Sequence, residues 1–249
     1  MIEINNLNLN YNTPNGILKI LSDFNLSIKS GEIISIIGPS GCGKTSLLRL
    51  ICNLIEPSNG MITINGETAT EARVKHKIGF VFQDPVLFDW RTVVDNIKLP
   101  EEISGEKVDE TDYQNIIRLV GLNGYEMFFP KQLSGGMRSR VSIARSLVYN
   151  PDLLLMDEPF SSLDEITRDK MNLELLKIWQ KIKNTIIFVT HNISEAILLS
   201  DQILVMSKIP AKVKRIVNIK LPRPRELSLK ESLEFVTYAG LLRNILEDD

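Results

Sequence analysis

The chain has 249 residues, of which 43% are hydrophobic, so it can bury one large core or two modest ones. Its 29 basic residues nearly balance its 31 acidic residues, which leaves no surplus of positive charge to neutralise nucleic-acid phosphates over a broad surface. We therefore expect a globular protein with no nucleic-acid partner.

The start of the chain and its longest apolar runs bear on its location. Residues 1–5 lack the basic leader and long apolar stretch of a secretory signal peptide. No apolar run approaches the roughly 20 residues that span a bilayer. The two cysteines, Cys42 and Cys52, show neither disulfide nor metal-site spacing, which suits a reducing compartment. We expect a cytoplasmic protein whose membrane role, if it has one, comes through a partner.

Apolar patterning predicts an α/β fold. Residues 2–9 and 24–28 alternate apolar and polar side chains, which indicates antiparallel strands near an edge. Residues 33–37, 153–156 and 185–189 are almost continuously apolar, as in strands covered on both faces. Because helical patterns lie between these later segments, we predict a mostly parallel central sheet.

A helical subdomain is expected within this fold. The stretch 84–150 shows no convincing strand, and apolar spacing predicts helices over 109–122 and 134–149. We interpret residues 1–83 and 151–220 as the α/β core with its antiparallel part, in one domain covering the whole chain.

The end of the chain completes this organisation. Short strands are expected at 202–206 and 213–219, and the proline-rich residues 221–225 then break regular structure. The tail, 221–249, is expected to be helical and too short to form another domain.

The best-defined motif follows the buried strand at 33–37. It fits the phosphate-binding pattern G-x-x-x-x-G-K-[ST], and a predicted helix at 45–53 continues from it. Glycines let backbone N–H groups turn inward, and the helix N-terminus adds partial positive charge. Lys44 is expected to reach the β- and γ-phosphates and Thr45 to bind Mg²⁺. The residues predicted to line the nucleotide site are Gly38, Pro39, Ser40, Gly41, Cys42, Gly43, Lys44, Thr45 and Ser46.

An ordinary glycine-rich turn is the alternative for this motif, and the strand-to-helix context disfavours it.

Two adjacent acids, Asp157 and Glu158, follow another buried strand. They should lie at the carboxyl edge of the sheet, where ligands of α/β folds bind. Asp157 is expected to hold Mg²⁺, and Glu158 to accept a proton from the attacking water or to orient it. Solvated acids at strand ends are common, so this interpretation depends on the phosphate-binding loop.

Leu133-Ser134-Gly135-Gly136-Met137 is a motif that phosphate-binding loops in general do not share. With it, nearly the whole chain resembles the ATP-binding cassette (ABC) ATPases, whose signature is usually LSGGQ. Met137 in place of glutamine looks like the nitrate, sulfonate and taurine importer branch. Ser134 can cap the following helix, and Gly135 and Gly136 allow close backbone approach to phosphate. A helix cap alone remains the alternative for Ser134.

Other family motifs stand in the expected order. Tyr11 looks like the aromatic residue that stacks on adenine, although it can equally be a strand aromatic. Gln83 matches the glutamine that senses Mg²⁺ and links the core to the helical subdomain. The segment 161–164, with Asp164, matches the loop that crosses the dimer interface. His191 matches the histidine that contacts the γ-phosphate.

The resemblance implies a P-loop NTPase cassette that binds ATP and Mg²⁺ and hydrolyses ATP. Two copies would associate head to tail, so that the signature of one closes over the ATP held by the other. The dimer would act on integral-membrane permease subunits, and through them on a solute-binding protein, at the cytoplasmic face of the membrane as a peripheral subunit.

The segment 84–93 is expected at the permease contact. Phe88 and Trp90 can be interface anchors, or they can pack the helical subdomain. The resemblance to the nitrate, sulfonate and taurine branch favours import over export of a small solute.

Three other functions were weighed. A soluble cassette ATPase of translation or DNA repair usually carries paired cassettes, a coiled-coil insertion or strongly basic segments, none of which is visible here. A nucleotide kinase or GTPase would leave residues 133–137 unexplained. A non-catalytic nucleotide-binding module is disfavoured by the presence of Lys44, Asp157, Glu158 and His191.

Overall fold

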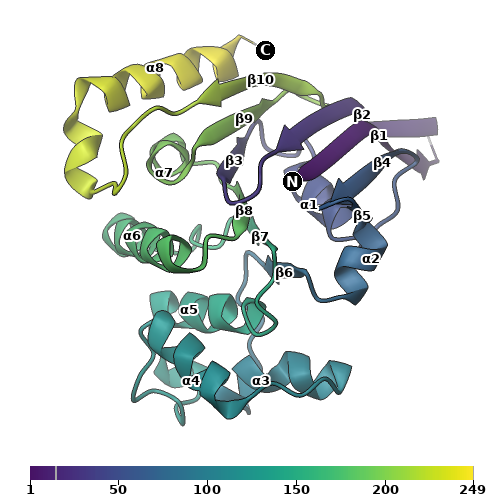
Figure 1. The fold of residues 1–249 in the computed structure, drawn as a ribbon. Helices are drawn as coiled ribbons and strands as arrows, with labels where there is room; N and C mark the ends of the chain where they lie inside the picture. Colours follow the sequence, from purple (N-terminus) through teal and green to yellow (C-terminus); the bar gives the residue numbers. More distant parts are fainter. Residues whose placement is uncertain (15, 249) are drawn as a thin grey trace.

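The computed structural model describes residues 1–14 and 16–248, which form two sheets surrounded by helices (Figure 1). The smaller sheet is antiparallel, with strand order β2-β1-β4-β5. Its strands are β1 (Ile2–Thr13), β2 (Gly16–Ile28), β4 (Asn59–Ile64) and β5 (Glu67–Thr68). The alternating N-terminal pattern therefore predicted β1 and β2 correctly.

The larger sheet has the order β10-β9-β3-β8-β7-β6, and all neighbours run parallel except β10 beside β9. Its strands are β3 (Ile33–Ile37), β6 (Ile78–Val81), β7 (Leu153–Asp157), β8 (Thr185–Val189), β9 (Gln202–Met206) and β10 (Val213–Asn218). Every residue of β3, β7 and β8 is buried, as their continuous apolar runs predicted.

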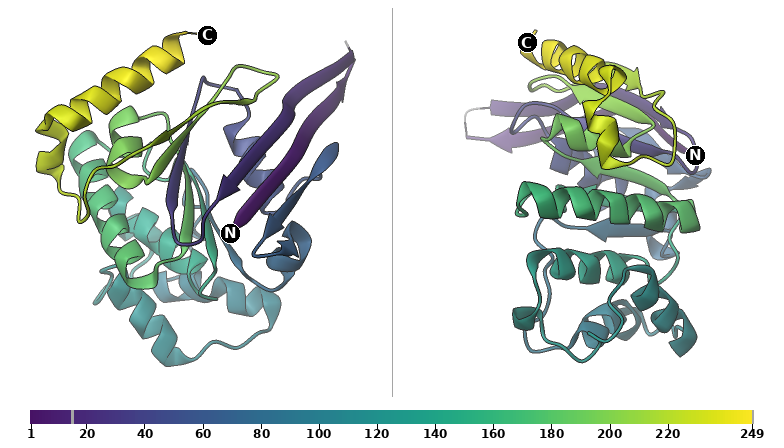
Figure 2. Two further views of the ribbon diagram at one scale, coloured as in Figure 1. Left: turned by 45° about the horizontal axis from the view of Figure 1, so that its top comes forward. Right: turned by 90° about the vertical axis from the view of Figure 1, so that its left-hand side faces the viewer.

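Helices cover the larger sheet and extend below it. In the right-hand view of Figure 2, α8 lies at one end, α6 crosses the middle, and α3, α4 and α5 form the opposite end. The α-helices are α1 (Lys44–Ile51), α2 (Ala69–Val74), α3 (Val93–Ser104), α4 (Glu110–Leu119), α5 (Gly135–Ser146), α6 (Glu165–Ile182), α7 (Ile193–Leu199) and α8 (Leu233–Glu247). Two short 3₁₀ segments are η1 (Pro130–Gln132) and η2 (Leu227–Glu231).

Residues 84–150 contain α3, α4, η1 and α5 and no strand, as the sequence predicted. This part has no separate core, because Val93 and Val141 belong to the same buried cluster as Met156 and Phe188 of the sheet. The helical part is therefore packed onto the sheet as well as linked to it through the chain.

The helix α3 was not predicted from the apolar pattern of the sequence. Pro100 lies inside this helix, and proline disfavours a helix interior because it removes a hydrogen bond and its ring clashes with the preceding turn. A start signal was nevertheless present, since Thr92 and Asp95 form a reciprocal capping box at its N-terminus.

None of the helices in the described residues is long and apolar enough to cross a bilayer.

Asn96 fixes the loop that leads into α3. Its side chain is fully buried, and its Oδ1 accepts from the Phe88 N–H at 2.8 Å. Its Nδ2 donates to the carbonyls of Phe88, Arg91 and Thr92 at 3.2, 3.2 and 2.9 Å. One buried amide thus contacts four backbone groups of the loop, of which the Phe88 and Thr92 carbonyls also accept the backbone N–H groups of Arg91 and Asn96.

Replacing Asn96 by alanine is expected to lower the free energy of unfolding by about 2–3 kcal/mol, because the Phe88 N–H loses its acceptor and the loop carbonyls lose the Nδ2 donor. Urea unfolding followed by circular dichroism measures this loss. Asn123→Ala, an exposed asparagine of the same helical part, is the control. Equal stability of the two variants would show that Asn96 does not support the loop.

Candidate functional site

Four neighbouring parallel strands bring the predicted site residues to one edge of the sheet. The carboxyl end of β3 leads into the phosphate-binding loop, and that of its neighbour β8 leads to His191. Next to β8, β7 leads into Glu158, and β6 leads toward Gln83. Ligands of open α/β sheets bind at this edge. Residues from four distant parts of the sequence therefore meet there through topology alone.

The phosphate-binding loop has the geometry that its glycines predicted. Gly43 has φ +99°, and a Cβ at this position would lie 2.8 Å from Cγ2 of Ile20. Gly41 also has a left-handed φ of +75°. No side chain caps the N-terminus of α1, and its first turn carries no acid. The helix thus presents free N–H groups and its positive end to an anion.

Lys44 points back over this loop. Its side chain is 8% exposed, and its Nζ donates to the carbonyls of Gly38 and Pro39 at 3.0 Å each. The ammonium group is thereby held at the loop, where a bound phosphate chain would meet it.

Thr45 and Asp157 place oxygen donors side by side. The Thr45 hydroxyl donates to Oδ1 of Asp157 at 3.2 Å, and Asp157 is 7% exposed. Burial raises the pKa of the Asp157 carboxyl, the Thr45 hydrogen bond opposes this, and the negative charge of Glu158 adds to it. A desolvated carboxylate beside a hydroxyl fits a hard cation such as Mg²⁺, which takes few protein ligands when phosphates and water supply the rest.

No cluster of three or more His, Cys, Asp or Glu side chains with metal-site geometry occurs in the described residues.

Glu158 and His191 form a pair at the strand ends. Nδ1 of His191 lies 3.0 Å from Oε2 of Glu158. Glu158 has a left-handed φ of +47°, and its N–H donates to the Val189 carbonyl of β8 at 3.0 Å. This backbone bond fixes the unusual conformation, which directs the Glu158 side chain toward the strand that precedes His191.

Gln83 lies at the other side of this edge. It is exposed, and its Nε2 donates to the Ser161 hydroxyl at 3.4 Å, which joins the end of β6 to the segment 161–164. Asp164 caps α6 by accepting the Thr167 N–H at 3.0 Å, and this bond lowers the pKa of its carboxyl.

The signature residues 134–136 lie apart from the phosphate-binding loop of the same chain. Ser134 accepts the Met137 N–H at 3.3 Å, so the predicted helix cap is confirmed. A Cβ on Gly135 would lie 2.9 Å from Leu163, and one on Gly136 would lie 3.4 Å from Thr167. The signature thus packs on the start of α6, while α1 lies on the far side of the sheet (Figure 1).

Tyr11 is 43% exposed on β1, where it pairs with Leu18 of β2. The same hairpin borders the phosphate-binding loop through Ile20, whose side chain limits the space at Gly43. Stacking of Tyr11 on adenine remains a prediction.

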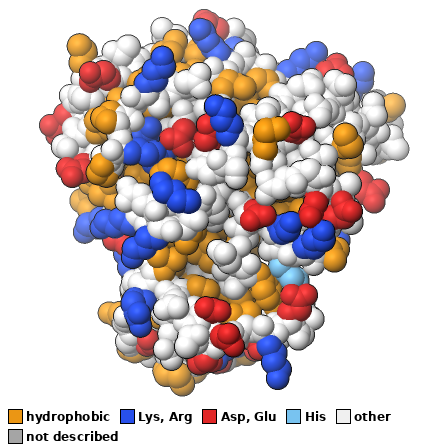
Figure 3. Space-filling model, viewed as in Figure 1, with side chains coloured by type: hydrophobic (Ala, Val, Ile, Leu, Met, Phe, Trp, Pro, Cys, Tyr) orange, Lys and Arg blue, Asp and Glu red, His pale blue; other side chains and the backbone are white. Residues whose placement is uncertain are grey.

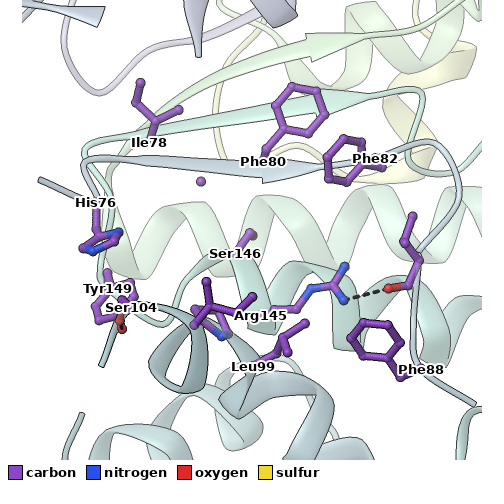
Figure 4. A pocket seen from close by; sticks show the side chains of 14 residues that line it. His76, Ile78, Phe80, Phe82, Phe88, Leu99, Ser104, Arg145, Ser146 and Tyr149 are labelled. Atoms are coloured by element: carbon purple, nitrogen blue, oxygen red, sulfur yellow. Dashed lines mark hydrogen bonds between the residues drawn. The ribbon is translucent and has the colours of Figure 1, made fainter. Parts of the chain in front are cut away.

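An apolar groove lies between β6 and the helical part. Its cavity volume is about 500 Å³. Ile78, Phe80 and Phe82 line one wall and Phe88 and Leu99 the other (Figure 4). In Figure 3, hydrophobic side chains gather along the junction of the sheet layer and the helices below it. Of Phe88 and Trp90, Phe88 lines the groove, and Trp90 is 73% exposed with its ring 4.9 Å from that of Phe88.

Two parts of the groove were not predicted from the sequence: the wall formed by Ile78, Phe80 and Phe82, and the contacts of Arg145. Nη1 and Nη2 of Arg145 donate to the carbonyls of Val86 and Pro85 at 2.8 Å each, which holds the loop at the groove. Large apolar residues at every second position from Ile78 to Phe82 were the available signal for the wall, because they share one face of a strand. No local pattern indicates the Arg145 contacts.

Comparison with known proteins decides the family. The sequence matches the family described as "ABC transporter" over residues 21–161. The chain belongs to the ABC transporter family. It is thus an ATP-binding and ATP-hydrolysing subunit, and its cassette fold agrees with the predicted P-loop NTPase fold.

Relatives of this family match along most of the chain. An uncharacterized ABC transporter ATP-binding protein of Methanocaldococcus jannaschii is 41% identical, covering 100% of this chain and 92% of the relative. The aliphatic sulfonates import ATP-binding protein SsuB of Bacillus cereus is 39% identical, covering 98% and 99%. The taurine import ATP-binding protein TauB of Pelagibacter ubique is 40% identical, covering 86% and 81%.

Solved ABC cassettes share the fold. A dimeric ABC transporter cassette, MJ0796, superposes with a TM-score of 0.77 at 31% identity, covering 89% of this chain and 100% of that one. The same cassette in a post-hydrolysis dimer bound to ADP and phosphate gives the same values.

Asp157→Asn is expected to raise the melting temperature of the nucleotide-free ABC subunit at neutral pH. Because the folded pKa is raised, ionising Asp157 costs folding free energy as pH rises above the unfolded pKa of about 4. Each 1 kcal/mol recovered should add about 2–4 °C.

Calorimetry at several pH values measures this gain, which should shrink toward about pH 4, where the wild-type carboxyl is also neutral. Asp248→Asn, at the exposed end of α8, is the control. A lower melting temperature for Asp157→Asn would contradict the expected cost of its charge.

Proposed function

We propose that this chain powers an ABC importer for an organic sulfonate, with taurine and aliphatic sulfonates as the first candidates. Support comes from relatives named as sulfonate and taurine import proteins, which match at 39–40% identity over most of this chain. The Met137 form of the signature agrees with the resemblance to that branch.

The phosphate chain of ATP would lie along residues 38–46. The free N–H groups of the α1 terminus and the Lys44 ammonium supply positive charge, and the space beside Gly41 is open, since a Cβ there would meet no atom within 4 Å. Thr45 and Asp157 would hold Mg²⁺, with Gln83 completing its surroundings. When bound, the ion would neutralise charge on the phosphate oxygens.

Glu158 would act on the attacking water. The water oxygen forms a bond to the γ-phosphorus, its proton passes to the Glu158 carboxylate, and the bond to the ADP oxygen breaks. His191 would contact the γ-phosphate, and its 3.0 Å contact with Glu158 supports a role in orienting that carboxylate. This pair also explains why a glutamate occupies a left-handed position that few residues adopt.

Two copies of the chain would form each complete site. The observation that carries this proposal is the separation of the signature from the phosphate-binding loop within one chain, on opposite sides of the sheet (Figure 1). A head-to-tail pair lets Ser134 and Gly136 of one copy approach the ATP bound by the other. The dimeric state of the related cassette supports the same arrangement.

A complementation test addresses the shared site. Lys44→Ala removes the phosphate-binding cation, and Ser134→Glu places a negative charge where the partner's phosphates would lie, so each homodimer should be inactive. After mixing, half of the randomly exchanged dimers carry one intact site, and turnover should recover to about a quarter of wild type. Phosphate release measures the rate. Turnover no higher than that of either variant alone would refute sites formed by two chains.

The apolar groove is the proposed contact for a permease. Its walls expose aromatic side chains that a short amphipathic segment can cover, and the loop holding Phe88 continues directly from Gln83. Docking there would connect the permease to the ATP site at the cytoplasmic face of the membrane. A solute-binding protein would deliver the sulfonate to the permease from the other side.

Uptake of radiolabelled taurine and of an aliphatic sulfonate tests the proposed transport. Deleting the gene is expected to abolish uptake, wild type should restore it, and Lys44→Ala should not. Phe88→Ala should restore about tenfold less, because an aromatic anchor is lost from the docking groove. Ile216→Ala, an exposed residue of β10, is the control.

Normal sulfonate uptake in the deletion strain would refute the cargo. Equal uptake with Phe88→Ala and Ile216→Ala would refute the groove contact.

A further inference from the structure

The residues on both sides of His191 are tied together by hydrogen bonds. Thr190 donates its hydroxyl to Oε2 of Glu195, and this hydroxyl oxygen accepts the Asn192 N–H at 3.0 Å. Asn192 Oδ1 in turn accepts the Glu195 N–H at 3.0 Å. The cycle encloses His191, whose own ring is exposed and bonded only to Glu158 among the described residues.

Glu195 is not needed as the cap of α7. Asn192 is the N-cap and already accepts the N–H that a capping side chain usually takes. The Glu195 carboxylate instead accepts from Thr190, which directly follows β8. The backbone N–H of Thr190 donates to the Ile36 carbonyl of β3 at 3.2 Å. The bond between Thr190 and Glu195 therefore joins the first turn of the helix to the strand end before His191.

Keeping this carboxylate in the interior is costly. Glu195 is 6% exposed, and its Oε1 has no hydrogen-bond partner among the described residues. Burial raises its pKa, which the Thr190 hydrogen bond and the positive charge of Arg168 oppose. Because α7 is buried from Glu195 to Leu199, a carboxylate there costs free energy unless it is hydrogen-bonded, and the bond from Thr190 offsets part of this cost.

The neighbours of Glu195 lead to the segment 161–164. Asn172 of α6 is buried near the carboxylate, and its side-chain amide makes no hydrogen bond among the described residues. One turn earlier on the same helix, Arg168 donates to the carbonyls of Phe160, Ser161 and Leu163 at 3.2, 3.5 and 2.6 Å. The groups around Glu195 thus also hold the loop that Gln83 contacts.

We propose that Glu195, acting through Thr190, is a positioning residue that holds His191 against Glu158 for ATP hydrolysis. The inference rests on the proposed role of His191 and adds the group that fixes its backbone. Thr190 and Glu195 are 2% and 6% exposed, so neither side chain is open to a nucleotide bound at the sheet edge. Their loss should therefore change turnover and leave ATP affinity nearly unaltered.

The test is steady-state ATPase kinetics of the full-length protein. Thr190→Val keeps the shape of the side chain and removes the hydroxyl, and kcat is expected to fall on the order of 100-fold with KM little changed, since a small misplacement of a reacting group has this effect. Thr190→Ser restores the hydroxyl and should recover most of kcat. Thr237→Val, on an exposed part of α8, is the matched control.

A double variant separates positioning from general damage. If Thr190 acts only through His191, then Thr190→Val combined with His191→Ala should be no slower than His191→Ala alone. Additive losses, or an unchanged kcat in Thr190→Val, would overturn the proposal. Should Thr190→Val fail to fold, Glu195→Leu removes the acceptor together with its buried charge and is expected to show the same kinetics.

Different results would contradict the positioning role of Glu195 and Thr190 and the role of His191 in ATP hydrolysis. An inactive His191→Ala with an active Thr190→Val and an active Glu195→Leu would remove only the positioning role. A fully active His191→Ala would remove the role of His191 in the proposed function, and the positioning role with it.

Discussion

The parallel pairing of β3, β8, β7 and β6 is the constraint on which the rest of the structure depends. Because these strands point the same way, their last residues share one edge, and groups as distant in sequence as Thr45 and Asp157 come within hydrogen-bond reach. The phosphate-binding loop has the shape to hold an anion, but only this pairing adds an acid pair and a histidine to it. Burial of β3, β7 and β8 on both faces holds the edge rigid.

The helical part depends on this sheet in a different way. It shares a buried cluster with β7 and β8, so its position is set by packing against the sheet. The groove and the proposed ATP site are also joined through one short loop, in which Gln83 contacts Ser161, and Arg145 donates to the carbonyls of Pro85 and Val86. A partner seated in the groove would thus press on a segment fixed at both ends, which gives coupling a physical route.

Much of this could be predicted from sequence, because the signals are local. Continuous apolar runs predicted β3, β7 and β8, and the spacing of glycines with Lys44 predicted the phosphate-binding loop before any comparison. The helix α3 was not predicted, although the capping box at Thr92 is a local start signal, and the Pro100 inside the helix weakens the sequence signal for it. The contacts of Arg145 and Glu195 could not be predicted, since no local sequence pattern distinguishes a buried charged side chain from a solvated one.

The backbone conformation of Glu158 limits how far the stability of this protein can be raised without loss of its activity. A left-handed glutamate is strained by roughly 1 kcal/mol, which glycine or asparagine would relieve. Selection for heat resistance alone would therefore favour replacing the very residue proposed to act on water. A laboratory lineage evolved for stability without a demand for turnover should lose Glu158 early, and a lineage under both demands must find its stability elsewhere in the fold.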